Sequence, residues 1–294
     1  MPILRGLTSS FITRFLAPRM RTIIVIPARY PSTRLPGKPL VMIAGRTMLE
    51  RVVALSRSAA SGLAGVEVIV ATDDGRISEH CQEIGVPSVM TPSACPSGTD
   101  RVAEAIRRLG GHPDFVINMQ GDAPLTPPSM VRALIESFAA APTDIVTPVT
   151  QLSWDELDAL RRAKATTPFS GTCAVFDSTS GRAYWFSKQI LPAIRREERY
   201  RSESRLSPVF RHIGLYGYRR EMLDRYATLP EGRFEKLEGL EQLRALEHGY
   251  TIRCVPVETE DRPTMSGIDS PEDVTRAEEL IRVWGDPFDG STTT

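Results

Sequence analysis

Apolar runs and helix-spaced apolar positions alternate along the first half of the chain. Residues 23–26 are four consecutive β-branched residues, which predicts a strand buried on both faces and ended by Pro27, since proline cannot donate to a neighbouring strand. The same patterns predict strands at residues 66–71, 87–90 and 114–118, and helices at residues 47–61, 76–84 and 100–109. Strands that alternate with helices at this spacing indicate right-handed crossovers, and so an α/β fold with a mostly parallel central sheet.

The segment after the first strand is basic and conformationally restricted. It carries Arg29, Arg34 and Lys38, and its backbone freedom is reduced by Pro31, Pro36, Gly37 and Pro39. Three cations presented on a stiff loop suit a polyphosphate. The alternative is a solvated turn whose charges happen to cluster. The order of residues is neither G-x-x-x-x-G-K-[ST] nor G-x-G-x-x-G.

Three loops are expected to meet at one edge of the sheet. Ligands of parallel sheets bind beyond the carboxyl ends of the strands, where residues 28–38, 72–75 and 120–125 should lie together. Asp122 is at the tip of the third loop. A Mg²⁺ ion that bridges phosphates takes one or two carboxylates, so Asp122 is a candidate ligand, with an ordinary turn residue as the alternative.

A polar segment, Ser-Gly-Thr-Asp-Arg at residues 97–101, leads into the third predicted helix. Free N–H groups at a helix N-terminus can meet a phosphate or the polar edge of a nucleotide, and the alternative is a simple helix cap. A second helix start follows Asp269, with Ser270 as the cap and Pro271 in the first turn.

Composition narrows the class of protein. The 294 residues have 41% hydrophobic and 24% charged content, as in globular proteins, and 36 Lys+Arg balance 36 Asp+Glu. A neutral balance gives no support to nucleic-acid binding over the whole surface. The four cysteines are far apart, which excludes a structural zinc pattern and favours a reducing cytoplasm.

The first 21 residues differ from the rest. They contain no acidic residue, and apolar positions at roughly helical spacing accompany Arg5, Arg14, Arg19 and Arg21. This is typical of an organelle transit peptide, with a disordered extension before a start at Met20 as the alternative. Residues 286–294 are expected to be a disordered tail. No stretch approaches the ~18 apolar residues of a membrane span.

Seven motifs in order resemble those of 3-deoxy-manno-octulosonate cytidylyltransferases, the CMP-Kdo synthetases. The motifs lie at residues 26–40, 71–74, 97–101, 120–122, 212–218, 240–244 and 267–273, and the resemblance covers residues 22 to about 281. It implies a Rossmann-like nucleotidyltransferase domain at residues 22–285, with residues 151–211 forming a smaller α/β dimerisation arm. It also implies a homodimer that joins CMP from CTP to an acidic eight-carbon sugar, releases pyrophosphate and serves lipopolysaccharide or capsule synthesis.

The resemblance assigns roles to individual residues. Arg34 and Lys38 resemble the phosphate clamps, and Asp122 with Asp269 resembles the Mg²⁺ pair. The remaining assignments are cytidine contacts at Ala28, Arg29, Ser97 and Gly98, a sugar contact at Gln120, and a sugar-acid pocket formed by His212, Tyr216, Glu241 and Gln242. From the residues alone, His212 and Tyr216 read as interior or face positions of one alternating strand, and Glu241 with Arg244 as an i,i+3 surface pair.

The arm is less regular in pattern. It reads as a helix at 152–164, strands at 172–176 and 183–186, and a charged loop or helix at 195–205, with Tyr184, Trp185 and Phe186 serving an interface or the core. Three positions depart from the family pattern, which has Glu, Lys and Arg where this chain has Ala123, Cys173 and Lys188. The acceptor could therefore be a related acidic sugar or a sugar phosphate, and an inactive scaffold is a further alternative.

Overall fold

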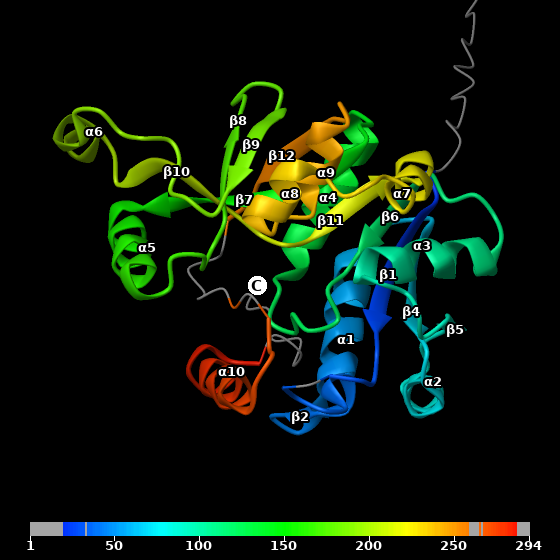
Figure 1. The fold of residues 1–294 in the computed structure, drawn as a ribbon. Helices are drawn as coiled ribbons and strands as arrows, with labels where there is room; N and C mark the ends of the chain where they lie inside the picture. Colours follow the sequence, from blue (N-terminus) through cyan, green and yellow to red (C-terminus); the bar gives the residue numbers. More distant parts are fainter. Residues whose placement is uncertain (1–19, 33, 259–264, 266, 287–294) are drawn as a thin grey trace, which may run out of the picture.

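A ten-stranded sheet runs through the computed structural model, which describes residues 20–32, 34–258, 265 and 267–286 (Figure 1). The strands of this sheet are β1 (Thr22–Ala28), β4 (Val66–Thr72), β5 (Ser88–Met90), β6 (Phe115–Asn118), β7 (Ile145–Ser153), β8 (Cys173–Phe176), β9 (Ala183–Ser187), β10 (Leu206–His212), β11 (Tyr216–Arg219) and β12 (Ile252–Pro256). Their order is β5-β4-β1-β6-β11-β7-β10-β8-β9, with β12 beside β7.

Two halves of the sheet differ in direction. The pairs among β5, β4, β1 and β6 are parallel, which confirms the predicted α/β architecture around the loops of interest. From β11 onward the neighbours are antiparallel, except that β12 is parallel to β7. The arm strands β8, β9 and β10 continue the same sheet.

Helices cover both faces of the sheet. They are α1 (Met48–Ala60), α2 (Gly75–Glu83), α3 (Gly98–Leu109), α4 (Pro128–Ala140), α5 (Trp154–Thr166), α6 (Glu197–Glu203), α7 (Arg220–Tyr226), α8 (Arg233–Glu238), α9 (Gln242–Glu247) and α10 (Pro271–Trp284). A short 3-10 turn, η1 (Lys38–Leu40), and the small hairpin of β2 (Met42–Ile43) and β3 (Arg46–Thr47) precede α1. Among the described residues, no helix is long and apolar enough to cross a membrane.

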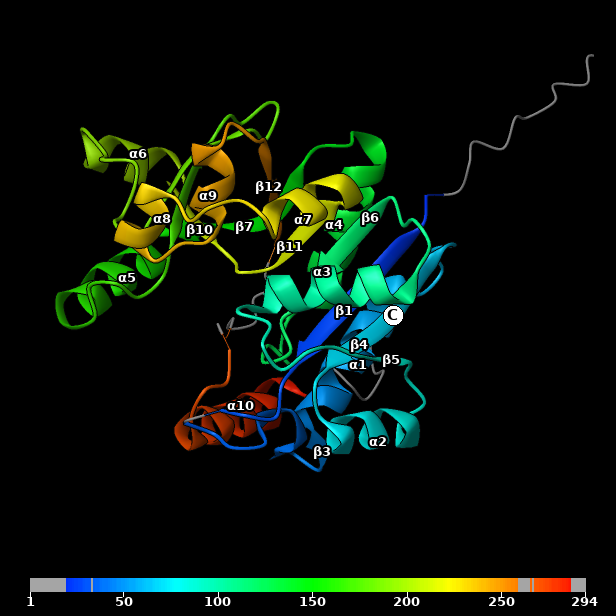
Figure 2. The same ribbon diagram turned by 45° about the vertical axis from the view of Figure 1, so that its right-hand side comes forward.

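β1 is buried on both of its faces. Helix α3 crosses one face of β1 (Figure 2). Ile23 and Val25 pack on that face with α3 and α7, whereas Ile24 and Ile26 pack on the other with α1, α2 and α4. A continuous run of β-branched residues meets this demand because neither face is open to water. The run therefore places its own carboxyl end in the middle of the sheet.

The prediction that β1 ends at Pro27 is wrong, because the strand continues to Ala28. A Cβ built on Gly121 would lie 2.4 Å from the Pro27 carbonyl oxygen, so this carbonyl faces the β6 side. The nitrogen of the same residue points that way too. On that side the ladder has already ended, at Val25 opposite Asn118. The missing N–H is therefore not required by any strand.

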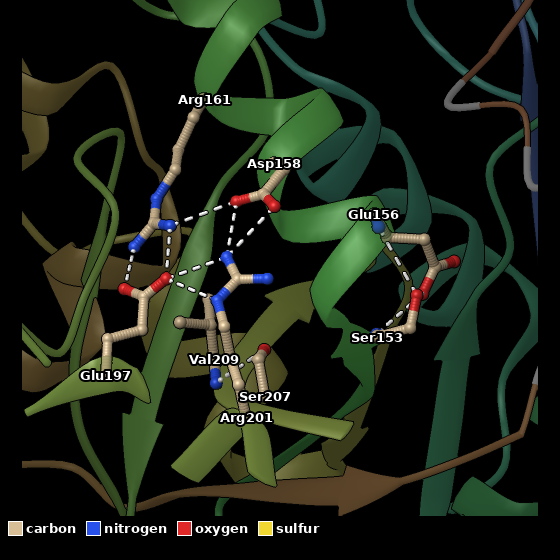
Figure 3. Close-up of polar contacts among 8 residues, drawn as sticks. All are labelled: Ser153, Glu156, Asp158, Arg161, Glu197, Arg201, Ser207 and Val209. Carbon is tan, nitrogen blue, oxygen red and sulfur yellow. Dashed lines mark hydrogen bonds and ion pairs between the residues drawn. The ribbon is translucent and has the colours of Figure 1, made fainter. Parts of the chain in front are cut away.

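The arm extends beyond β7, and ion pairs between side chains join its two helices, α5 and α6 (Figure 3). Arg161 on α5 contacts Glu197 on α6, and Arg201 on α6 contacts Asp158 on α5. β7 continues to Ser153, so α5 begins two residues later than predicted. The charged segment does form a helix, α6, and of the three aromatic residues Phe186 is buried while Tyr184 is exposed.

Two predictions about the second half are wrong. His212 and Tyr216 are both buried, as the interior reading expects, but His212 ends β10 and Tyr216 begins β11, so they do not share one strand. Arg244 pairs with Glu235 and not with Glu241, because Gly239 ends α8 in the left-handed conformation and α9 starts afresh after Glu241. The extension before residue 20 and the tail from residue 287 lie outside the described residues.

Candidate active site

The three predicted loops meet at the carboxyl edge of the parallel strands. β1 pairs in register with β4 and β6, so the ends of the three strands lie side by side. A cleft of about 740 Å³ lies beyond them. Its lining includes nine of the predicted site residues, namely Ala28, Arg29, Arg34, Lys38, Ser97, Gly98, Gln120, Asp122 and Asp269. The expected convergence is confirmed for residues 28–38 and 120–125, which both contribute to this lining. Residues 72–75 follow the end of β4 beside β1, but none of them lines the cleft.

The shape of the basic loop depends on Gly37 and Tyr30. Gly37 has φ 67°, and its N–H donates to the Tyr30 carbonyl at 3.2 Å. A Cβ at Gly37 would lie 3.1 Å from the Tyr30 hydroxyl, so glycine suits both the conformation and the space. The Arg76 guanidinium stacks on the Tyr30 ring, 3.3 Å from its centroid. The loop is thus closed on itself just before Lys38 begins η1.

The Lys38 ammonium lies between two carboxylates. Its Nζ is 2.6 Å from Asp122 Oδ2 and 2.8 Å from Asp269 Oδ1, and its side chain is only 15% exposed. Arg34 adds a contact of 3.0 Å to the other oxygen of Asp269. Burial alone would raise the pKa of Asp269, but the bonds from Lys38 and Arg34 hold the pKa of this carboxyl below its usual range.

Asp122 and Asp269 are far apart in the sequence, and a backbone hydrogen bond holds their two segments together. The Ile268 N–H donates to the Asp122 carbonyl at 2.9 Å. Gly267 has φ 147°, and a Cβ added there would lie 3.6 Å from the Asp122 carboxylate carbon, so its backbone passes close to this side chain. Ser270 and Asp273 form a capping box at the start of α10, and Asp273 also accepts from the Asp269 N–H. Asp269 is therefore placed by the helix start that the sequence predicts.

This pair of carboxylates fits a divalent cation that also binds phosphates. Mg²⁺ keeps several waters and takes one or two protein carboxylates together with substrate oxygens. The described residues contain no cluster of three or more His, Cys, Asp or Glu that would form an all-protein metal cage. Lys38 Nζ, a cation at hydrogen-bond distance from both groups, shows that positive charge is accommodated between them.

The side of the cleft next to α3 contains a buried ion pair of Arg101 and Asp73, two residues to which the sequence assigned no role. Arg101 lines the cleft and bonds to Asp73 at 2.9 Å and to the Thr91 hydroxyl at 2.6 Å. Asp73 lies in the motif at residues 71–74 and Arg101 in the motif at residues 97–101, so their membership in these motifs was the sequence signal for a role at the site. Ser97 caps α3 in a capping box with Asp100, so the N-cap reading of this segment is confirmed.

A smaller cavity of about 80 Å³ lies beside the cleft, and Gln120 lines both. His212, Arg211 and Ala123 also line it. His212 is buried, which together with nearby Lys188 lowers the pKa of its imidazole to about 3. Of the residues that the resemblance assigns to the sugar, Gln120 and His212 are the two that line this cavity.

The other three predicted pocket residues line neither cavity. Tyr216 donates through its hydroxyl to Gln242 at 3.0 Å, and both are buried. Glu241 accepts from the Thr99 hydroxyl at 3.3 Å, and burial raises the pKa of its carboxyl. The bond from Tyr216 joins β11 to α9, and the bond to Glu241 joins the start of α9 to α3.

The three departures from the family pattern have different settings. Ala123 lies on the small cavity, whereas Cys173 is fully buried in the arm core. The Lys188 N–H donates to Glu238 at 2.8 Å, and burial lowers the pKa of its ammonium. The Lys164 ammonium donates to the Lys188 carbonyl at 2.5 Å, which brings a second lysine to this part of the arm.

Comparisons with known proteins agree with this geometry. The profile described as cytidylyltransferase matches residues 23–252. A 3-deoxy-manno-octulosonate cytidylyltransferase of Maricaulis maris is 42% identical over 269 residues, covering 91% of this chain and 99% of its own. Its counterpart from Myxococcus xanthus is 42% identical over 269 residues, with coverage of 90% and 98%.

A solved structure gives the same answer. The CMP:2-keto-3-deoxy-manno-octonic acid synthetase complexed with CTP superposes with a TM-score of 0.75 at 34% identity, covering 90% of this chain and 99% of that one. The resemblance inferred from the seven motifs is confirmed. The chain therefore belongs to the cytidylyltransferase family and, within it, to the 3-deoxy-manno-octulosonate cytidylyltransferases.

Proposed function

We propose that this enzyme transfers CMP from CTP to the anomeric hydroxyl of 3-deoxy-manno-octulosonate (Kdo) and releases pyrophosphate. The observation that carries the proposal is the convergence of Arg34, Lys38, Asp122 and Asp269 in one cleft, next to the cap of α3. The product would serve lipopolysaccharide or capsule synthesis. Four free cysteines agree with a reducing compartment such as the cytoplasm.

The cations of the cleft act on the triphosphate. In the reaction the anomeric hydroxyl loses its proton to water and its oxygen forms a bond to the α-phosphorus. The bond between the α-phosphorus and the oxygen that bridges it to the β-phosphorus breaks, and that oxygen leaves with pyrophosphate. Lys38 and Arg34 lie where they can neutralise the charge that develops on the leaving pyrophosphate. Little covalent chemistry is required of the protein, so charge and positioning account for its contribution.

Asp122 and Asp269 would hold Mg²⁺. When bound, the ion would neutralise phosphate charge and lower the pKa of the acceptor hydroxyl. The phosphates would compete with the two carboxylates for Lys38, which now bonds to both. Lys38 would therefore exchange its bonds to the two carboxylates for bonds to phosphate oxygens when the nucleotide binds.

The acceptor is proposed to lie across Gln120, between the cleft and the small cavity. Arg211 lines this cavity and supplies a positive charge for the acid group of the sugar. Ala123 lies on the same cavity, so a related acidic sugar is the second candidate acceptor. The intact set of charges in the cleft argues against an inactive scaffold.

A homodimer is proposed to form through the arm. A groove of about 1500 Å³ between β8, β10 and the end of β12 has a mixed lining of polar residues and of apolar residues that include Phe176, Leu206 and Phe210. Leu206 is 45% exposed although it is a large hydrophobic residue. Light scattering should show a dimer that Leu206→Asp converts to a monomer. Leu237→Asp, at a 69% exposed position on α8, is the matched control.

The reaction is tested by supplying purified enzyme with each of four nucleoside triphosphates and a panel of acidic sugars and sugar phosphates. We expect product from CTP and Kdo only when Mg²⁺ is present. Asp122→Asn and Asp269→Asn should each abolish pyrophosphate release while circular dichroism shows retained folding. Product from UTP and a sugar phosphate, or activity that survives both variants, would overturn the proposal.

A further inference from the structure

His212 is held rigidly at the end of β10. Its ring contacts Phe186 edge-on at a centroid distance of 5.0 Å and lies 5.5 Å from the ring of Tyr216. The residue is 8% exposed and lines the small cavity that shares Gln120 with the nucleotide cleft. Little freedom remains for the imidazole to turn, so the roles of its two nitrogens depend on what each one contacts.

One nitrogen is bonded to Thr147, a fully buried residue of β7. His212 Nε2 lies 2.8 Å from the Thr147 hydroxyl oxygen. That hydroxyl also lies 2.8 Å from the Leu215 carbonyl oxygen and 3.3 Å from the Ile213 carbonyl oxygen. A carbonyl can only accept, and a hydroxyl has one proton to donate.

The Thr147 hydroxyl therefore donates its proton to the Leu215 carbonyl oxygen. The hydroxyl oxygen must then accept from His212, which places the imidazole proton on Nε2. The other nitrogen, Nδ1, is left unprotonated and has no hydrogen-bond partner among the described residues. It is an acceptor that the protein itself does not use.

We propose that Thr147 is a positioning residue that holds His212 as the Nε2–H tautomer, so that Nδ1 accepts a hydrogen bond from a hydroxyl of the acceptor sugar. The inference rests on the proposed function, because it assumes that the sugar occupies the cavity beside Gln120. It makes His212 a fixed acceptor and not a carrier of protons.

The charges around the ring agree with a neutral imidazole. Lys188, directly after β9, and Arg211, next to His212 in the chain, are positive, and Tyr216 is a buried phenol. The pKa of His212, lowered to about 3 by burial and Lys188, keeps the ring uncharged at neutral pH.

A neutral acceptor selects the group that faces it. It bonds to a hydroxyl but repels a carboxylate, which also has only acceptor oxygens. The acid group of the sugar is therefore directed away from Nδ1 and toward a cation, and Arg211 lines the same cavity. An analogue that lacks the facing hydroxyl should be rejected, because the buried acceptor would lose its partner.

The tautomer can be measured without substrate. The chain has four histidines, so ¹⁵N-histidine NMR gives few signals, and the loss of one in His212→Asn assigns His212. We expect the Nε2–H form of His212, unchanged between pH 5.5 and 8. A proton on Nδ1, or a ring that titrates in this range, would overturn the inference whether or not the proposed reaction occurs.

Kinetics test the role toward the sugar. Thr147→Val should disturb the tautomer and raise the KM for Kdo about tenfold, with kcat and the KM for CTP changed less than about twofold. Thr147→Ser keeps the hydroxyl and should restore the KM. Thr22→Val, at a buried threonine whose hydroxyl has no partner, is the matched control for the isosteric change.

The outcomes separate the two proposals. An altered tautomer in Thr147→Val with an unchanged KM for Kdo would overturn the sugar contact while leaving CMP transfer intact. Absence of any product from Kdo with the wild-type enzyme would overturn the proposed function, and the NMR result would still decide the tautomer. If Thr147→Val does not fold, the wild-type spectrum still decides the tautomer, and Thr147→Ser still tests the role of the hydroxyl. A KM for Kdo that is raised tenfold in Thr147→Ser would contradict the proposal that the Thr147 hydroxyl positions His212.

Discussion

Lys38 Nζ lies 2.6 Å from Asp122 Oδ2, although the two residues are 84 positions apart in the chain. The same ammonium lies 2.8 Å from Asp269, so one lysine joins the two carboxylates proposed to hold Mg²⁺. A divalent cation would have to share this space with the ammonium or displace it. The relationship connects the proposed chemistry with the state of the enzyme before the nucleotide binds.

Lys38→Met should lower turnover by more than tenfold, about 1.4 kcal/mol of transition-state stabilisation, because it removes a charge directed at the leaving group. The same variant should bind Mn²⁺ more tightly in the absence of nucleotide, as measured by electron paramagnetic resonance. Lys236→Met, at an exposed lysine on α8, is the control. Unchanged turnover in Lys38→Met would contradict the phosphate role.

Arg101→Met should destabilise the fold by about 3 kcal/mol, because it leaves the buried Asp73 carboxylate without its partner. Urea unfolding measures the change, and a weakened affinity for CTP is expected with it. The double variant with Asp73→Leu should recover part of the stability, since no lone charge remains. Equal losses in the single and double variants would show that charge pairing is not the cause.

Gly121→Ala should destabilise the protein by about 1–3 kcal/mol and impair nucleotide binding, because its Cβ would lie 2.4 Å from the Pro27 carbonyl oxygen. Thermal unfolding measures the first effect and calorimetric titration with CTP the second. Gly75→Ala is the control, since a Cβ there meets no atom within 4 Å and alanine favours the helix. Similar stability for the two variants would contradict the close approach at Gly121.

The ion cluster of the arm predicts a dependence on pH (Figure 3). Bonds from Arg161 and Arg201 lower the pKa of Glu197 to about 2 from a usual 4.5. A lowered pKa means that the contribution of Glu197 is complete above pH 4.5 and is lost as pH falls toward 2. Glu197→Gln should therefore lower the Tm at pH 7, and the difference from wild type should shrink by pH 3.

The matched control for this effect is Glu198→Gln, at the exposed neighbouring position on α6. It should leave the Tm close to that of the wild type at pH 7. A gap between wild type and Glu197→Gln that stays constant from pH 7 to pH 3 would show that the contacts of Glu197 are not electrostatic in origin.

Local patterns in the sequence were enough to determine the parallel half of the fold. Residues 23–26 specify a buried strand by their composition, and Ser97 and Ser270 specify helix starts by hydrogen bonds to residues three positions away. These signals are local, so they can be read along the chain. The motifs likewise identified the family, and with it all nine predicted residues that line the cleft.

Only the tertiary structure decided which residues contact one another across the chain. Nothing near Lys38 in the sequence indicates Asp269, which is 231 positions away, and the tautomer of His212 depends on Thr147 of another strand. Tyr216 and Gln242 were expected in a pocket but bond to each other behind it. Such contacts depend on how strands and helices are placed in space, and a periodic pattern states only which face of an element is buried.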